Sequence, residues 1–147
     1  MGRTRISSKG LLLLFISLFL SVNLYAQEQT VMTRKCPSGL EVIMVFDADK
    51  LVTMQPVTTT LKILDPQGAP ISNALVYCSF YIPNFATGAN SPKIKATDQN
   101  GLYEGLVFFT HEGRWNVDLT INLPNGGYEE VTFNIDQVLP NPTISAL

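Results

Sequence analysis

The chain has 147 residues and a formal net charge of −2, and 46% of its residues are hydrophobic. This length allows one ordinary domain whose core is large enough to fold without several disulfides. The sequence has no basic cluster, which excludes nucleic-acid binding and peripheral attachment to anionic membranes, because both require a concentrated positive patch.

Residues 1–26 have the layout of a secretory signal peptide. Arg3, Arg5 and Lys9 precede an apolar run, and the small residue Ala26 follows it. We expect export and cleavage near Ala26. The alternative is an uncleaved anchor, although an apolar core of roughly 10–15 residues is shorter than the ~20 that span a bilayer. Cleavage would leave 7 Lys+Arg against 12 Asp+Glu, a net charge of −5, so we expect a periplasmic or secreted acidic domain without stable membrane insertion.

A polar lead-in at 27–39 is followed by repeated strand patterns and turns up to residue 138. The clearest turn is at 65–68, where Pro66 and Gly68 favour a β-turn. Apolar residues then alternate through 74–82, until Pro83 removes an amide donor and ends the strand pairing.

The remaining strands are expected from the same two-residue alternation. Residues 114–123 give the cleanest case, with Trp115 on the inward face as a core anchor, and an Asn125-Gly126 turn then closes a hairpin. In total we expect strands at 40–46, 57–64, 74–82, 93–96, 102–110, 114–123 and 130–135.

Helical periodicity is absent from the sequence, so the expected class is all-β. An immunoglobulin-like antiparallel β-sandwich of about seven strands at 40–138 fits the number and spacing of the strands. A cleaved signal peptide and the lead-in precede this domain, and a Pro-rich tail follows it at 139–147.

Two cysteines, Cys36 and Cys78, remain after the signal segment. In an oxidising compartment they could form one disulfide. Alternatively they are two separate thiols, with Cys78 packed as a small hydrophobe on the inward face of its strand. Their spacing fits neither a metal site nor a CxxC redox motif.

Catalysis is not expected from this sequence. A serine triad would depend on the single histidine, His111, and no G-x-S-x-G elbow precedes a helix. Most acidic residues are at turns or outward strand positions, which is typical of solvated charge rather than of a paired-carboxylate site.

No cofactor is expected, and copper is the alternative. Soft thioether and imidazole ligands suit Cu(I), and the chain offers Met32, Met44, Met54 and His111. Met44 alternates with core residues, so we expect it to pack in the core. Met54 and His111 are at loop or turn positions where ligands could converge, although His111 is also an ordinary turn residue.

The region 61–123 resembles the YtkA-like and FixH-like group of exported β-sandwich domains. The matching motifs, in order, are Leu61-Lys62-Ile63-Leu64-Asp65, Gly68-Ala69-Pro70-Ile71, Asn73-Ala74-Leu75-Val76, Ile82-Pro83, Gly101-Leu102-Tyr103-Glu104-Gly105 and Gly113-Arg114-Trp115-Asn116-Val117. This resemblance implies an immunoglobulin-like fold facing the periplasm or the cell exterior, and a role in copper handling or respiratory oxidase assembly.

Copper handling in that group is associated with methionines around the proline at the end of the strand. Here the corresponding stretch is Tyr81-Ile82-Pro83-Asn84-Phe85, which has no thioether. A second resemblance, of 65–74 and 97–103 to carboxypeptidase regulatory-like domains, implies the same all-β class and a non-catalytic module.

The sequence therefore supports two hypotheses. The first is a non-enzymatic exported binding or accessory module of YtkA-like type, which contacts a protein or a small ligand through Tyr81, Asn84 and Phe85 beside a long loop at 84–98. A core position for Phe85 is the alternative to that surface. The second hypothesis is a periplasmic copper-binding domain that uses Met54 and His111.

Overall fold

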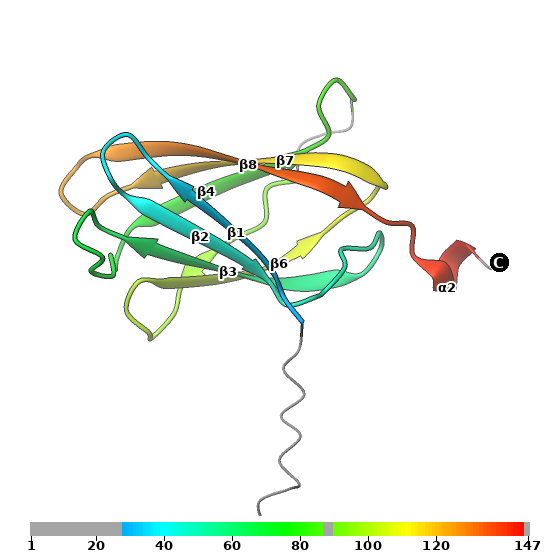
Figure 1. Ribbon diagram of the computed structural model, residues 1–147, viewed down its shortest axis with the longest axis horizontal. Coiled ribbons are helices and arrows are strands. Elements are labelled where there is room, and N and C mark those ends of the chain that lie inside the picture. Colours follow the sequence, from blue (N-terminus) through cyan, green and yellow to red (C-terminus); the bar gives the residue numbers. More distant parts are fainter. Residues whose placement is uncertain (1–27, 87–89, 146–147) are drawn as a thin grey trace, which may run out of the picture.

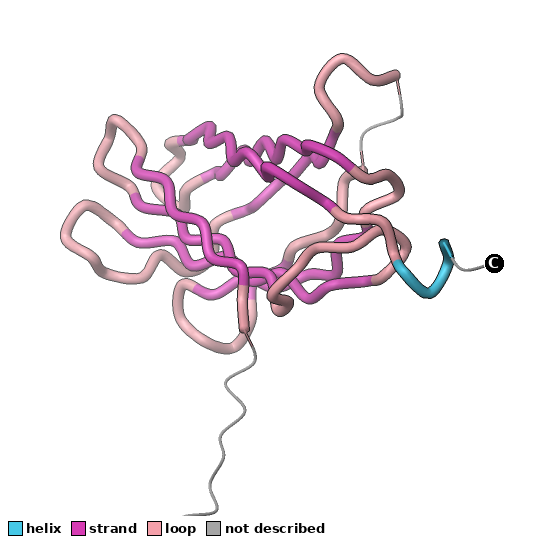
Figure 2. Tube along the Cα trace, turned by 45° about the vertical axis from the view of Figure 1, so that its right-hand side comes forward, coloured by secondary structure: helices cyan, strands magenta, loops and turns pink. Residues whose placement is uncertain are grey.

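The computed structural model describes residues 28–86 and 90–145, so the expected signal peptide lies outside the described residues. The described residues form eight strands and one short helix (Figures 1 and 2). They are β1 (Thr30–Lys35), β2 (Glu41–Phe46), β3 (Pro56–Leu64), β4 (Leu75–Tyr81), β5 (Lys95–Ala96), β6 (Leu102–Phe108), β7 (Gly113–Asn122), β8 (Tyr128–Val138) and α2 (Pro142–Ser145).

The strands form two antiparallel sheets that pack as a sandwich. One sheet has five strands in the order β1-β2-β3-β6-β5, and the other has three in the order β4-β7-β8. Figure 1 shows the two sheets as separate layers. The all-β sandwich expected from the alternation is confirmed, and each expected strand is present within a few residues of its expected limits.

The core lies between the sheets and is formed by the inward residues of each strand. Trp115 is 2% exposed, which confirms it as a core anchor. Four aromatic rings make edge-on or tilted contacts, with centroids 5.3–6.5 Å apart. They are Phe46, Phe80, Phe109 and Trp115.

The lead-in expected at 27–39 is corrected by β1. This strand pairs with β2 along its whole length, from Thr30 opposite Phe46 to Lys35 opposite Glu41. On its inward side, Met32 packs against the core. Arg34, two residues further along, extends to the edge of β8 and donates from Nε to the Thr132 carbonyl oxygen at 3.3 Å. The segment is therefore an edge strand with a polar composition, and the sandwich begins before residue 40.

The tail after Val138 is also part of the fold. The Leu139 amide donates to the Leu51 carbonyl at 2.9 Å, and the Thr53 amide donates to the Leu139 carbonyl at 2.9 Å. The Asn141 amide donates to Thr53 Oγ1 at 3.1 Å. Helix α2 has four residues, and the described chain has no helix with the length and apolar character of a membrane span.

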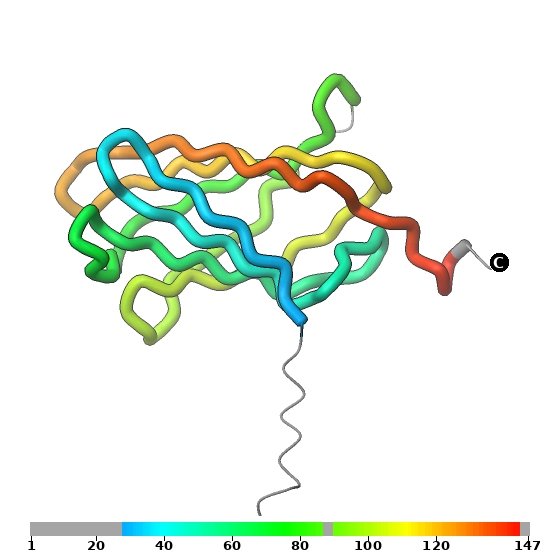
Figure 3. The backbone as a smooth tube through the Cα atoms, in the orientation of Figure 1, coloured from blue at the N-terminus to red at the C-terminus, as the bar shows by residue number. Residues whose placement is uncertain are grey.

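The two ends of the sandwich are formed by different connections, as Figure 3 shows. One end, which we call the hairpin end, has the connections 36–40, 65–74, 97–101 and 123–127. The other end, which we call the loop end, has the connections 47–55, 82–94 and 109–112 and the tail. The aromatic cluster of the core lies beneath the loop end, because Phe46 and Phe80 lie near the ends of β2 and β4 while Trp115 lies near the start of β7.

Candidate functional site

The residues expected to form a contact surface gather at the loop end. Tyr81 is the last residue of β4 and pairs with Asn116. Asn84 has a left-handed backbone, with φ of 61°, which turns the chain after Pro83. Phe85 is 52% exposed, so it is a surface residue and not part of the core. Residues 87–89 of the loop expected at 84–98 lie outside the described part of the chain.

His111 joins this surface although it is 26 residues further along the chain than Phe85. The two rings meet edge to face with centroids 5.4 Å apart. Thr110 Oγ1 is 2.8 Å from His111 Nδ1, and the His111 carbonyl accepts the indole N–H of Trp115 at 3.0 Å. The histidine is therefore an exposed turn residue that is fixed by a core tryptophan.

Met54 lies in the neighbouring loop. Its amide donates to the Phe109 carbonyl at 2.8 Å, two residues before His111. Its φ is 59°, an unusual conformation for a residue other than Gly, Asn or Asp, and its side chain is 49% exposed. The backbone thus brings the two expected metal ligands to the same end of the sandwich.

The other methionines have structural positions. Met44 is fully buried, which confirms its expected place in the core, and Met32 packs against the core. Among residues 28–86 and 90–145 there is no group of three or more His, Cys, Asp or Glu side chains that could hold a metal.

Cys36 and Cys78 are free, buried thiols, so the disulfide alternative is not what the structure shows. Cys36 lies beside Glu129 of β8, whereas Cys78 is in the middle of β4.

Both thiols are poor nucleophiles. Burial raises the pKa of Cys78 to about 11, and its Sγ donates to the Pro92 carbonyl at 2.9 Å. The pKa of Cys36 is also raised, chiefly by burial and then by the negative charge of Glu129. Since the thiolate is the reactive form, neither cysteine is set up for catalysis.

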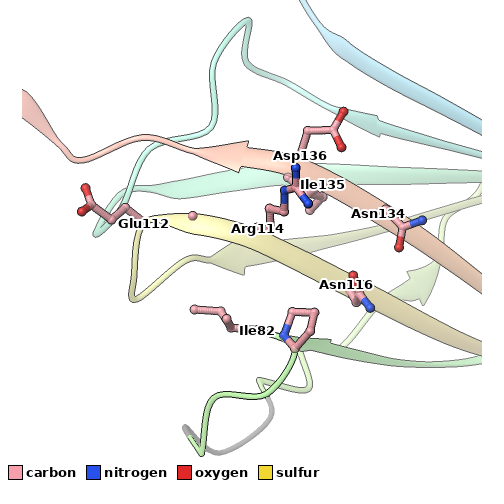
Figure 4. Close-up of a pocket in the computed structure, with 9 residues that line it drawn as sticks. Ile82, Glu112, Arg114, Asn116, Asn134, Ile135 and Asp136 are labelled. Atoms are coloured by element: carbon pink, nitrogen blue, oxygen red, sulfur yellow. The ribbon is translucent and has the colours of Figure 1, made fainter.

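A groove of about 500 Å³ opens beside the aromatic rim (Figure 4). Its size falls in the usual range for small-ligand sites. It lies on the outer face of the three-stranded sheet. The end of β4, the first half of β7 and the second half of β8 border it. Side chains that line it include Ile82, Pro83, Glu112, Arg114, Asn116, Asn134 and Asp136.

The groove exists because β4 is shorter than β7. Pairing of β4 ends where Tyr81 meets Asn116, since Pro83 lacks an amide donor, while β7 continues back to Gly113. On its other side β7 meets a β-bulge, because two residues of β8, Asp136 and Gln137, oppose Arg114. Bulges often re-aim a side chain next to a binding site.

The polar side chains of the groove are free of partners. Within the described residues, none of the five polar side chains that line the groove makes a hydrogen bond or an ion pair. These five residues are Glu112, Arg114, Asn116, Asn134 and Asp136. Further along the same face, Thr132 Oγ1 donates to Asp118 Oδ1 at 2.7 Å. The groove thus brings together five polar side chains without partners in the described residues, whereas the Asp118–Thr132 pair on the same face is bonded.

Sequence reasoning predicted that the strand ends before Pro83, as the structure has it, but did not find the groove. One signal was present in the sequence: Asn116 and Asn134 lie nine residues on either side of Asn125 in the hairpin turn, and they are paired directly across β7 and β8. The register of a hairpin follows from its turn, so this pair could have been derived. The bulge at Asp136 had no comparable local signal.

The comparisons with known proteins agree with this architecture. The model of the YtkA-like family matches residues 38–120. No curated protein matches the chain in sequence.

Two solved structures share the fold at 10% identity. A DUF4426 family protein from Pseudomonas aeruginosa has a TM-score of 0.56, with 80% of this chain and 99% of that chain covered. A copper-bound variant of FetP from uropathogenic Escherichia coli has a TM-score of 0.55, with 75% of this chain and 97% of that chain covered.

Proposed function

The chain belongs to the YtkA-like family, and from this premise we propose that it is an exported, non-catalytic accessory domain that binds its partner through the loop end. The signal-peptide pattern at 1–26 supports export. The proposal that it is not an enzyme rests on the sequence, in which the only histidine stands in a turn and no nucleophile elbow occurs.

One observation carries the choice of surface: the contact between Phe85 and His111 beside a groove of unpartnered polar groups. An aromatic side chain that is 52% exposed gives apolar contact area, and the groove supplies hydrogen-bonding groups. Binding surfaces combine such an aromatic anchor with polar contacts around it. The hydrogen bond from the core residue Trp115 to the His111 carbonyl fixes this part of the surface, and such preorganisation lowers the entropy lost on binding.

Site-specific photo-crosslinking in the native host tests this proposal. A photoreactive phenylalanine derivative replaces Phe85, and a matched chain carries it at Tyr77, which is 60% exposed in the middle of β4. We expect the processed protein in the exported fraction, with a discrete crosslinked product from position 85 and none from position 77. Equal products from both positions, or none from either, would contradict the proposed surface.

Copper binding is a second candidate, favoured by the hydrogen bond that links the Met54 loop to the strand leading into His111. A thioether and an imidazole are donor types that suit Cu(I), so the residues fit this metal in kind. Met54 and His111 would hold the ion, and it would supply soft-metal transfer rather than hydrolysis. The copper-bound FetP structure has the same fold and is compatible with this candidate.

Titration of the mature domain with Cu(I) against a competing chelator tests the copper candidate. Met54→Leu keeps the size and removes the sulfur, and His111→Gln removes the imidazole, so each should weaken binding at least tenfold. Met32→Leu is the matched control, because Met32 packs against the core. Retention of full affinity in both site variants, or failure of the natural domain to compete, would exclude Met54 and His111 as ligands.

A further inference from the structure

The groove beside β4 combines groups of both charge signs. Arg114 contributes a guanidinium, while Asp136 and Glu112 contribute carboxylates, and no ion pair joins them among the described residues. Figure 4 shows Arg114 and Asp136 on neighbouring strands, with the amides of Asn116 and Asn134 further along the same groove. Glu112 lies at the outer end, in the turn before β7.

We infer that this groove binds a small zwitterion of the amino-acid class, either a free amino acid or a short peptide with both termini free. Arg114 takes the carboxylate, because its planar fork matches a carboxylate in two parallel hydrogen bonds. Asp136 takes the ammonium group, and Glu112 adds negative charge at the mouth. This inference rests on the proposed function, since it names the ligand of the same binding end.

The spacing of the polar groups agrees with such a ligand. Arg114 lies opposite the bulge that contains Asp136, so the two groups of opposite charge are neighbours across the strand pair. Asn116 is two residues further along β7, roughly 7 Å from Arg114. A dipeptide spans a similar length, about 7 Å, and its amide can bond to the carboxamides of Asn116 and Asn134.

Other ligand classes leave charges of the groove without a partner. A simple anion satisfies Arg114 but meets a net charge of −1 from the three charged side chains. A simple cation leaves the guanidinium without a partner, and a neutral sugar matches none of the three charges. Ile82 and Pro83 form an apolar wall, which suits a small aliphatic side chain.

Binding of the dipeptide Ala-Ala to the mature domain tests the inference. Calorimetry and amide chemical shifts measure this binding. Four forms are compared: the free dipeptide, the N-acetylated form, the C-terminal amide and the form blocked at both ends. We expect shifts centred on β7 and β8 for the free dipeptide, and at least tenfold weaker binding for each blocked form. Free alanine, tested in parallel, distinguishes a single amino acid from a peptide as the better ligand.

The roles of the two charges are separated by variants. Arg114→Gln should abolish the preference for a free carboxylate, and Asp136→Asn should abolish the preference for a free amine. Asp118→Asn is the matched control on the same face, because Asp118 already accepts from Thr132 and does not line the groove. Circular dichroism and thermal melting of each variant confirm that the domain remains folded.

Three outcomes overturn the inference: no binding of Ala-Ala at about 10 mM, equal binding of the blocked forms, or competition by glucose. Photo-crosslinking from position 85 distinguishes failure of the inference from failure of the proposed function, because Phe85 does not line the groove. A crosslink from position 85 together with absence of dipeptide binding would retain the accessory domain and reject the zwitterion. Dipeptide binding without the crosslink would retain the site and reject the protein contact.

Discussion

The turns of the hairpin end and the groove at the loop end use polar side chains differently. In two turns of the hairpin end the side chain is bonded within the fold: Asp65 Oδ1 accepts the amides of Gln67 and Ala69, at 2.9 and 2.8 Å. Asn125 Oδ1 accepts the Gly127 amide at 3.0 Å in the same manner. At the loop end, the polar side chains that line the groove make no hydrogen bond or ion pair in the part of the chain that the structure describes.

This difference separates residues that stabilise the fold from residues available to a ligand. A polar group that is already bonded within a turn contributes to stability and has little left to offer a ligand. A polar group without a partner is solvated in the free protein and can exchange that water for a ligand. Changes at the hairpin end should therefore lower stability, and changes at the loop end should lower binding.

The largest loss of stability is expected from Gly101→Ala. Gly101 has a φ of 72°, and a Cβ there would lie 2.5 Å from Pro70 Cβ. We expect a loss of about 3 kcal/mol or more in the free energy of unfolding, from backbone strain and overpacking combined. Gly68→Ala is the control: its φ is 83° with no atom within 4 Å of the added Cβ, so it should lose only about 1 kcal/mol. Urea unfolding measures both.

Tyr103→Phe should be the next largest effect. The phenol donates to the Ile71 carbonyl at 2.8 Å and accepts the Ala74 amide at 3.0 Å, and the side chain is 1% exposed. Its removal leaves two backbone groups without a partner, so we expect a loss of about 2 kcal/mol in stability. Ala-Ala affinity should not change. A variant with full stability would contradict the assignment of this hydroxyl to the scaffold.

The buried Cys78 thiol should lower the free energy of unfolding at alkaline pH. The pKa of Cys78 is about 11 in the folded chain, against an ordinary value of 9.0. Between these pH values the unfolded chain releases the proton and the folded chain retains it, so stability falls as pH rises. The loss approaches about 2 kcal/mol by pH 11.

Urea unfolding from pH 8 to 11 under reducing conditions measures this loss. Cys78→Val removes the ionisable group and should flatten the dependence over this interval. A Cys78→Val chain with the same slope as the natural one would assign the alkaline loss to other groups.

The smallest effects on stability are expected at the groove. Arg114→Gln and Asp136→Asn should each change the free energy of unfolding by no more than about 0.5 kcal/mol, because both are exposed side chains without partners. Dipeptide affinity should still fall at least tenfold. If either variant lost as much stability as Tyr103→Phe, the groove side chains would contribute to the fold, and the proposed difference between the two ends would be wrong.

Much of the fold could be predicted from local sequence, because alternation and turn chemistry act over a few residues. Pro66, Gly68 and Asn125 mark turns that the structure contains. The alternation around Trp115 placed its whole strand. Strand β1 was missed because it is an edge strand: it packs one methionine inward, and Arg34 extends over the Phe133 ring at 5.9 Å. Burial, which generates the pattern, is incomplete there.

The candidate site could be predicted only in part, because it depends on pairings between distant segments. The positions of Tyr81 and Phe85 at the end of a strand could be predicted, because Pro83 ends the strand pairing. The contact of Phe85 with His111 requires β4 to pair with β7, and the opposition of Asp136 to Arg114 requires the register of β7 and β8. No property of residues near Asp136 in sequence reports that bulge.

The connection between the tail and the Met54 loop has a mechanical consequence. Leu139 is bonded to both Leu51 and Thr53, so tension on the C-terminus passes into this loop before it reaches the core. A tether or fusion after the tail therefore pulls on the segment that presents Met54. An insertion at the Asn125 turn, at the far end of the sandwich, would place no tension on that segment.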